Sequence, residues 1–350
     1  MDDPCPEDLN NNSESYDSEG SENNSDSEEI ENNDDWNLDY KNEVKFWNEL
    51  IKKGYIYKPD ICPVCNNGKF ELKNHNKKNI NKIFYCRCSF IKCRKKSELR
   101  NFSIMRISRN LPASIFFKIV EYFFFDELNA RKITNKLQNE YNNKIHPYKI
   151  EKLLKSFRLL IYNHLKKKYA TTLIGGFNEL NSPKIVAIDE SLLIHNSQND
   201  QIWMLGGIET AGRRIRLSLS KTRTSEALSE FVYSNFFEGT HFVHDSWLGY
   251  NFFNNNLNYT HEVHVHGGGD FGNGLHSTSH IENYWAQFKK LLARIYGMIP
   301  KKNYVLYFRE IEFRINMSYK NIEQKKIILK DIFKNLYLEN QYSFDEVNDL

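Results

Sequence analysis

The sequence lacks any long apolar stretch. Its longest run, Ile115 to Phe125, is interrupted by Lys118 and Glu121, whereas a membrane-spanning helix needs roughly 18 or more apolar residues with few or no charges. The amino terminus is acidic and has no apolar core of the kind that secretory signals carry. We therefore expect an intracellular protein that does not associate with membranes.

Basic residues are absent from the first 40 positions, which hold 15 Asp and Glu. A segment with so few apolar residues cannot bury enough surface to offset its chain entropy, which predicts a disordered acidic arm over 1–44. The arm either keeps the protein in solution or imitates DNA within the molecule. The rest of the chain has 48 Lys and Arg against 30 Asp and Glu, a net charge of +18. Such a basic chain suits a nucleic acid.

Cysteine is also scarce, yet five of the six cysteines fall between 62 and 93. Two pairs of thiolates on tight turns, about twenty residues apart, are typical of structural zinc. Cys62 and Cys65 form the first pair. The second pair is ambiguous, and we favour Cys88 and Cys93 over Cys86. This predicts a zinc-ribbon module over 45–105.

Basic side chains surround the second cysteine pair, which favours contact between the ribbon and DNA phosphates; the alternative is a solvated face on a purely structural module. The predicted contacts are Lys92, Arg94, Lys95 and Lys96. Three helices follow over 112–125, 129–141 and 147–168, and lysines recur every three residues on one face of the last. These are Lys149, Lys152 and Lys155. The pattern suits a DNA-binding helix-turn-helix over 106–175; the alternative is a plain helical linker.

A mixed α/β domain is predicted over 182–340. Buried-strand patterns occur at 185–190, 201–208 and 214–221, with Gly206 and Gly207 read as irregular backbone. A helix, a strand ending at Asp245, a helix, a short strand at 260–266 and a long helix from Ser279 to about Tyr296 follow. This is the element order of an RNase H-like domain with a mixed five-stranded sheet. In that architecture the first and fourth strands are neighbours.

Acidic residues end the first and fourth strands of this pattern, at Asp189, Glu190 and Asp245. On the long helix Glu282 and Lys289 are two turns apart and share one stripe. If the stripe faces the strands, then Asp189, Asp245 and Glu282 converge. Carboxylate oxygens favour Mg²⁺ or Mn²⁺, and two such ions support in-line phosphoryl displacement. Alone, each acid is as easily a turn former or part of a helix cap.

Histidines crowd the same region, with His264 and His266 on one face of the predicted strand. A metallohydrolase site that uses imidazoles is therefore a rival interpretation, although no His-His-carboxylate spacing typical of zinc hydrolases is present. His266 is a candidate for orienting the substrate or a carboxylate.

Four stretches resemble the ISXO2-like transposase domain, whose eukaryotic relatives form the Merlin superfamily of cut-and-paste DNA transposons. They lie at 188–190, 203–207, 243–250 and 276–289. The most specific is Thr278-Ser279-His280-Ile281-Glu282-Asn283-Tyr284-Trp285, followed by Lys289. The resemblance covers about 62–340 and implies ribbon, helix-turn-helix and catalytic domain in that order.

The resemblance implies Asp189 and Asp245 as the first two ligands of the metal. The family uses an Asn or Glu as the third, and Ser279 occupies the Asn position here, which leaves Glu282 for this role. Lys289 matches a family lysine and is expected to hold a DNA phosphate near the scissile bond.

The sequence thus predicts a multidomain α+β protein: a DDE transposase that binds double-stranded DNA at terminal inverted repeats, cleaves it with two Mg²⁺ or Mn²⁺ ions and carries structural Zn²⁺. The resemblance also implies a homo-oligomer, and short basic runs favour the nucleus. The alternative is a domesticated DNA-binding protein that retains the zinc and helical modules but has no activity.

Overall fold

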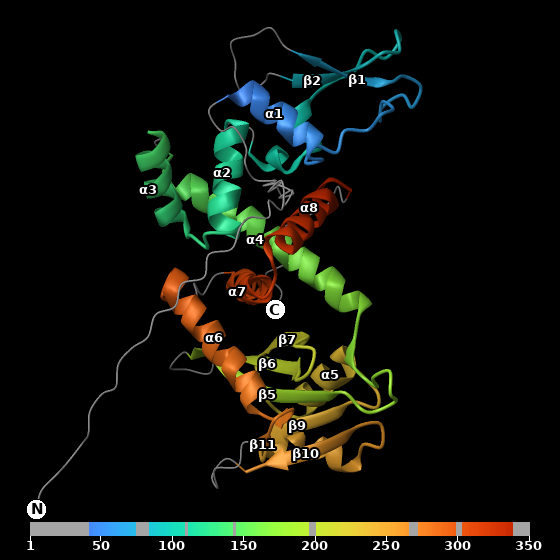
Figure 1. Ribbon diagram of the computed structural model, residues 1–350, viewed down its shortest axis with the longest axis vertical. Coiled ribbons are helices and arrows are strands. Elements are labelled where there is room, and N and C mark those ends of the chain that lie inside the picture. Colours follow the sequence, from blue (N-terminus) through green and yellow to red (C-terminus); the bar gives the residue numbers. More distant parts are fainter. Residues whose placement is uncertain are drawn as a thin grey trace, which may run out of the picture. The chain divides into compact units, whose positions relative to one another are not determined.

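The computed structural model describes residues 42–74, 84–108, 111–142, 145–195, 201–265, 272–298 and 303–338, with side chains up to 334. These residues lie in a compact unit that begins at Leu38 (Figure 1). The predicted acidic arm falls almost wholly outside the described residues, and His266 lies outside them too. Among the described helices, none is both long enough and apolar enough to cross a membrane.

A three-stranded antiparallel sheet follows the first helix, as expected for a ribbon. Tyr57 at the edge of this region donates a hydrogen bond to the carbonyl of Lys330, 3.0 Å away. The elements are α1 (Glu43–Lys52), β1 (Phe70–Asn74), β2 (Phe84–Cys88), β3 (Lys96–Glu98) and the 3₁₀ helices η2 (Leu99–Phe102) and η3 (Ile104–Ile107). Helix α1, whose buried face includes Phe46 and Trp47, was not predicted.

All three predicted helices of the next segment are present: α2 (Ala113–Phe124), α3 (Ala130–Tyr141) and α4 (Pro147–Thr171). Pro112 occupies the cap of α2 without a side-chain bond, and Glu43 of α1 instead accepts from the backbone N–H groups of Ala113 and Ser114. This contact satisfies donors that a helix start leaves open. Two helices that were not predicted, α7 (Tyr304–Ser318) and α8 (Ile322–Leu338), pack against α4.

The predicted five-stranded sheet is confirmed, with strand order β10-β9-β5-β6-β7. β5 is central, β9 and β10 run parallel to it, and β6 and β7 are antiparallel neighbours. This is the RNase H-like arrangement that the element order predicts. The elements are β5 (Ile185–His195), β6 (Gln201–Glu209), β7 (Ile215–Ser220), α5 (Ser225–Asn235), β9 (His241–Asp245), η4 (Leu248–Asn255), β10 (Thr260–His264) and α6 (Ser279–Tyr296). Short pairs flank it: β4 (Ile174–Gly175) with β8 (Phe236–Phe237), and β11 (Gly272–Asn273) with β12 (His276–Ser277).

Three details of the sequence-based prediction were wrong. β5 does not end at Glu190 but continues to His195, because its pairing with β6 extends to His195 across an irregularity between Leu192 and Ile194. Gly206 and Gly207 are not irregular: both lie in the regular ladder between β5 and β7. The helix expected after Asp245 is the 3₁₀ helix η4.

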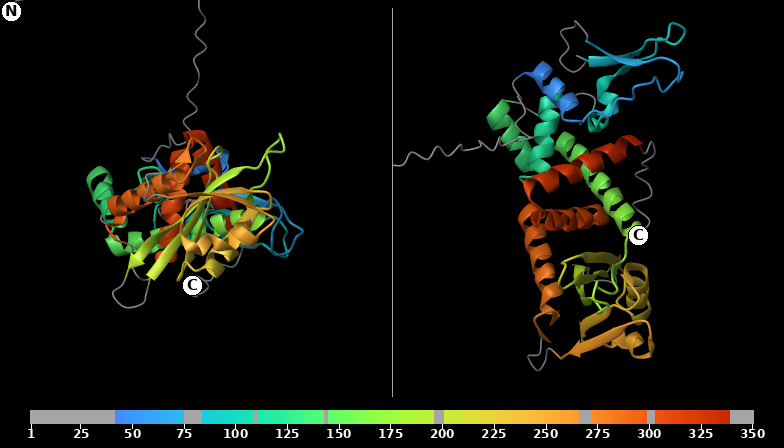
Figure 2. Two further views of the ribbon diagram at one scale, coloured as in Figure 1. Left: turned by 90° about the horizontal axis from the view of Figure 1, so that it is seen from below. Right: turned by 45° about the vertical axis from the view of Figure 1, so that its right-hand side comes forward.

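The two glycines allow bulky side chains to approach the sheet from both faces. A Cβ on Gly206 would lie 2.5 Å from the ring of Trp285 of α6, and one on Gly207 would lie 2.5 Å from the ring of Phe236. Hence α6, with α7 behind it, covers one face of the sheet, and α5 and η4 cover the other (Figure 2). The predicted apolar face of α6 is confirmed, because Ile281, Trp285, Phe288 and Ile295 are buried.

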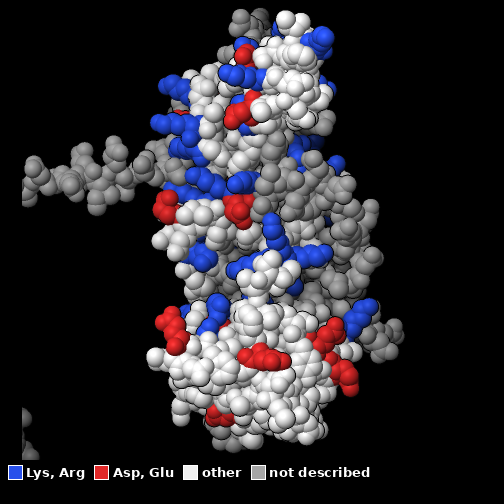
Figure 3. Space-filling view, turned by 90° about the vertical axis from the view of Figure 1, so that its right-hand side faces the viewer, with Lys and Arg blue, Asp and Glu red and all other residues white. Residues whose placement is uncertain are grey.

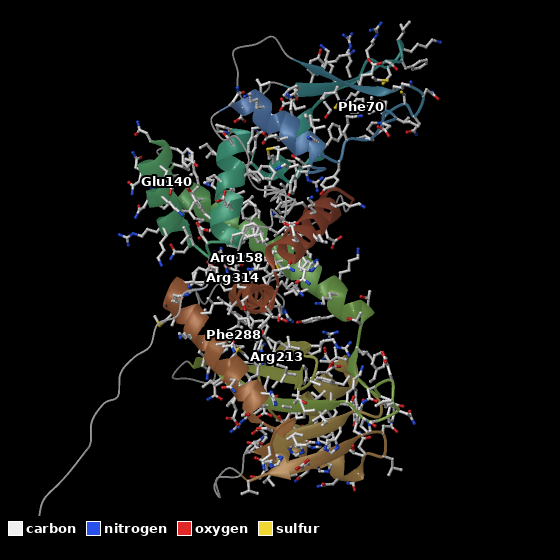
Figure 4. All side chains as sticks on the ribbon, viewed as in Figure 1. Phe70, Glu140, Arg158, Arg213, Phe288 and Arg314 are labelled. Carbon is white, nitrogen blue, oxygen red and sulfur yellow. The ribbon has the colours of Figure 1, made fainter. Side chains whose placement is uncertain are left out.

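A buried charge network joins three helices. Glu310 of α7, fully buried, accepts from Nε of Arg158 of α4 and from Nε of Arg314, both at 2.7 Å. The hydroxyl of Tyr296, at the end of α6, also donates to Glu310 at 2.7 Å. Figure 4 shows Arg158 and Arg314 close together where these helices meet. Glu310 therefore pairs with both buried guanidinium groups, and Arg158 also pairs with Glu151.

Replacing Glu310 by Gln is expected to cost about 3–5 kcal/mol of unfolding free energy, because it leaves the buried Arg314 guanidinium without a counter-charge and leaves Arg158 with Glu151 alone. Urea denaturation measures this loss.

Burial raises the pKa of Glu310, but Arg314 and Arg158 outweigh it and hold the pKa below its usual value. The stabilisation is therefore present above the ordinary glutamate pKa and is lost as pH falls through the lowered one. Asp126→Asn, which breaks a solvated pair with Lys136, should cost no more than about 1 kcal/mol; equal losses would contradict the prediction.

Candidate functional site

Asp189 of β5 and Asp245 of β9 lie on the same face of the sheet. The strand register pairs Ala187 with Val243 in parallel strands, and two further residues along each strand bring Asp189 opposite Asp245. Ala187 packs in the cluster that contains Trp285 and Phe288, whereas Val186 and Phe242 pack in the cluster on the opposite face. Both aspartates therefore point to the α6 side. The pair predicted from the strand order is brought together.

Helix α6 contacts this pair through Trp285, whose indole N–H donates to Oδ2 of Asp189 at 3.0 Å. Asp245 is oriented by the backbone N–H of Trp247, which donates to its Oδ1 at 3.0 Å. Sequence periodicity identified Trp285 as part of an apolar face but did not indicate that its ring nitrogen binds a carboxylate. The sequence did offer one signal, because the ring N–H of a buried tryptophan usually needs a hydrogen-bond acceptor.

The carboxyl groups here oppose one another's ionisation. Burial, then the neighbouring charges of Glu190 and Asp245, raise the pKa of Asp189 to about 7, against the opposing hydrogen bonds from Trp285 and the backbone. Burial also raises the pKa of Glu190 to about 7, and the charge of Asp245 adds to it. A cation bound between Asp189 and Asp245 would lower the pKa of Asp189 by its charge. The site thus has the donor chemistry of a hard divalent ion.

Glu190 lies on the other face of the sheet, because successive residues of a strand alternate. Its carboxylate is 3.9 Å from Arg223. The Arg223 guanidinium in turn lies between the rings of Trp203 and Trp247, 4.5 and 4.1 Å from their centroids. Arg223 was missed in the sequence, where nothing distinguishes it from other surface arginines. It links the first strand to the segment that orients Asp245.

Glu282 and Lys289 are both on α6, as predicted, with Glu282 half-buried one turn before Trp285 and Lys289 exposed. Among the described residues, the groups of three or more ligating atoms that lie within 4.8 Å of one another do not include Asp189, Asp245 and Glu282 together. The role of Glu282 as third ligand therefore stays a prediction. Thr278 is the cap of α6 and Ser279 is its first helical residue, whose hydroxyl lies 2.7 Å from that of Ser277.

The ribbon gathers four thiols, those of Cys62, Cys65, Cys88 and Cys93, within 4.8 Å of one another. Cys86, the alternative ligand, is buried outside this group, and burial raises its pKa to about 11. A hydrogen bond from the backbone N–H of Asn67 lowers the pKa of Cys65 to about 6. Gly68 makes room for the cluster, since a Cβ there would lie 2.5 Å from Sγ of Cys88. Four converging sulfurs fit tetrahedral zinc.

The predicted DNA contacts lie at the surface. Four exposed residues follow or flank Cys93: Lys92, Arg94, Lys95 and Lys96. Lys149 is exposed at the start of α4, and Lys152 and Lys155 follow one and two turns later. On the face that Figure 3 shows, Lys and Arg side chains gather over the half that contains the ribbon and the helical segment, and Asp and Glu are more frequent over the sheet.

The family model of the ISXO2-like transposase domain matches residues 191–316. No curated protein matches the chain. Among solved structures, the HTLV-2 integrase catalytic core domain in complex with magnesium (trimeric form) is 10% identical over 47% of this chain and 95% of its own, with a TM-score of 0.23. The simian T-cell lymphotropic virus intasome in complex with the PP2A regulatory subunit B56 gamma is 12% identical over 55% of this chain and 64% of its own, with a TM-score of 0.27. Because both TM-scores are low, no conclusion about this chain is based on these two structures.

The matched span begins two residues after Asp189 and contains Asp245, Glu282 and Lys289. It covers most of the sheet, the whole of α6 and most of α7. Residues 191–316 of the chain are thus similar to the ISXO2-like transposase domain.

Proposed function

We propose that the protein is a DDE transposase that cleaves DNA and joins its ends with divalent metal ions held by Asp189, Asp245 and Glu282. The observation that carries the proposal is the pair Asp189 and Asp245, side by side on one face of the sheet beneath α6. Two Mg²⁺ or Mn²⁺ ions would activate the attacking water or 3′ hydroxyl and stabilise the leaving oxygen. Asp189 and Asp245 would hold these ions from two neighbouring strands.

The remaining residues would position the DNA. Lys289 is exposed two turns along α6 from Glu282, within the helix that contacts the carboxylate pair, so its ammonium suits a backbone phosphate near the scissile bond. The basic residues of the ribbon and of α4 would bind the terminal inverted repeats. Such an enzyme joins two DNA ends, so we expect a homo-oligomer, and we expect it to act in the nucleus.

The thiol cluster would hold one structural Zn²⁺, which fixes the turns on which Lys92, Arg94, Lys95 and Lys96 are presented. The support is the tetrad of Cys62, Cys65, Cys88 and Cys93 and the depressed pKa of Cys65. Zinc prefers thiolates over thiols, so a low pKa in one ligand favours its binding.

The decisive experiment uses the full chain and duplex DNA from the genomic flanks of its coding sequence, including any terminal inverted repeat. We expect strand cleavage, and joining of the cleaved ends to a second duplex, in Mg²⁺ or Mn²⁺ and not in EDTA. Product gels measure both steps. Binding to this DNA without cleavage in either metal would favour the alternative, a DNA-binding protein derived from a transposase.

A further inference from the structure

A second group of ligating side chains lies at the opposite end of β9 from Asp245. It consists of His241 of β9, Glu262 of β10 and His276 of β12, and we call it the imidazole cluster. Their ligating atoms lie within 4.8 Å of one another. His241 and Asp245 are four residues apart along β9, which is about 13 Å in a strand. Asp189 and Asp245 are not among the residues of this group, so the cluster is distinct from the carboxylate pair.

Glu262 is the centre of the imidazole cluster. Its Oε2 lies 2.8 Å from Nδ1 of His276 and 3.6 Å from Nε2 of His241. Its other oxygen, Oε1, lies 3.3 Å from Nε2 of His264, which is buried. One oxygen of the carboxylate thus faces the two outer imidazoles, and the other lies near the ring of His264.

His241 presents the ring nitrogen that a metal ion would use. Its Nδ1 is 2.8 Å from the hydroxyl of Thr260, which leaves Nε2 directed at Glu262. That nitrogen is buried, and no partner lies within hydrogen-bond distance of it among the described residues. Burial, followed by the charge of His276, lowers the pKa of His241, which favours the neutral ring. A histidine that binds a metal ion is usually neutral, and its other ring nitrogen usually makes a hydrogen bond.

The cluster joins three separate pieces of backbone. β10 is the edge strand of the sheet, and the β11–β12 hairpin that carries His276 leads directly into α6. Gly272 of the hairpin lies against His264, since a Cβ on it would be 2.8 Å from that ring. An ion bound by His241, Glu262 and His276 would link the β11–β12 hairpin to strands β9 and β10. Because the hairpin leads into α6, the ion would also hold the first turn of α6 in position.

We propose that His241, Glu262 and His276 form a binding site for one divalent transition-metal ion of the zinc class, with water in the remaining position. Two imidazoles and one carboxylate are a ligand set that zinc favours over magnesium. The role of this site is structural, because its ion holds the hairpin before α6 in place. Its metal differs in kind from the hard ions of the carboxylate pair.

The test is the zinc content of the full chain after dialysis against Zn²⁺ in an excess of Mg²⁺, in an Asp189→Asn, Asp245→Asn background that removes the hard-ion site. Elemental analysis should find one equivalent of zinc more than in the same protein with His276→Ala or with His241→Ala. The matched control is His280→Ala, a histidine of α6 next to the same hairpin, which should retain the full content. A Cys62→Ser variant should lose the zinc of the thiol cluster and keep the zinc of the imidazole cluster.

Hydrogen exchange supplies a second readout that does not depend on DNA cleavage. Zinc should slow exchange of the backbone amides over 272–277 in the parent chain and leave them unchanged in the His276→Ala variant. Because His276 is about half exposed, its loss should leave the far-UV circular dichroism unaltered, and the more conservative His276→Gln serves if it does not. Equal zinc content in parent and histidine variants, with no zinc effect on 272–277, would show that the cluster is only a hydrogen-bonded group and would overturn the proposal.

Discussion

Asp189→Asn is expected to lower metal-dependent DNA cleavage by on the order of 10³-fold or more, because it removes a charged ligand from the site where the reaction is stabilised. Asparagine keeps the size of the side chain and one oxygen that can accept from the indole N–H of Trp285, 3.0 Å away in the parent. The geometry is therefore preserved while the affinity for a hard ion falls. Single-turnover cleavage rates at saturating Mg²⁺ measure the effect.

The same substitution should leave the thermal midpoint unchanged or raise it above pH 7. Because burial and neighbouring acids raise the pKa of Asp189 to about 7, its charged form opposes folding at higher pH, and a neutral side chain removes that penalty. Loss of activity without loss of stability separates a ligand from a structural residue. Asp60→Asn, at a fully exposed aspartate of the ribbon, is the control and should keep both properties. Full activity of Asp189→Asn would refute the assignment.

Cys62→Ser is expected to abolish stoichiometric zinc binding by the ribbon and to unfold the strands β1, β2 and β3. Structural zinc in small modules contributes roughly 10–16 kcal/mol of apparent binding free energy, far more than the short strands β1, β2 and β3 can supply alone. Limited proteolysis and zinc analysis report the two effects together. DNA affinity should fall as well, since Lys92 and Arg94 lose their fixed positions.

Cys86→Ser provides the matched comparison, because Cys86 lies on the same strand as Cys88, two residues away, but outside the tetrad. It should retain the zinc of the ribbon and resist proteolysis like the parent chain. If the two variants lose zinc equally, the ligand set proposed for the ribbon is wrong.

The sheet was predicted well because its sequence pattern is local. Alternating and continuous apolar runs identify each strand, and the order of elements then determines that β5 and β9 are neighbours. Periodicity likewise located α6 between Ser279 and Tyr296, the bounds that the structure has. The choice of Cys88 and Cys93 over Cys86 agrees with the thiol cluster for a similar reason, since spacing along a tight turn is also a local property.

Contacts between distant segments were not predictable. Nothing in the residues around Glu310 indicates that Arg158 lies beside it, 152 positions earlier in the chain. The glycines of β6 were misread because a glycine that admits a packed ring looks, in sequence, like one that turns the backbone. The imidazole cluster was missed for the same reason as the Glu310 network: His241 and His276 come from strands that only the fold brings near Glu262.

The single unbroken helix α4 has a mechanical consequence. Its 25 residues extend about 37 Å, with Lys149 exposed in the first turn and Arg158 locked to Glu310 in the middle. A continuous backbone hydrogen-bond ladder resists bending, so the two ends cannot tilt independently. The helix therefore keeps a constant distance between its first turn, where Lys149 is exposed, and the buried network around Glu310.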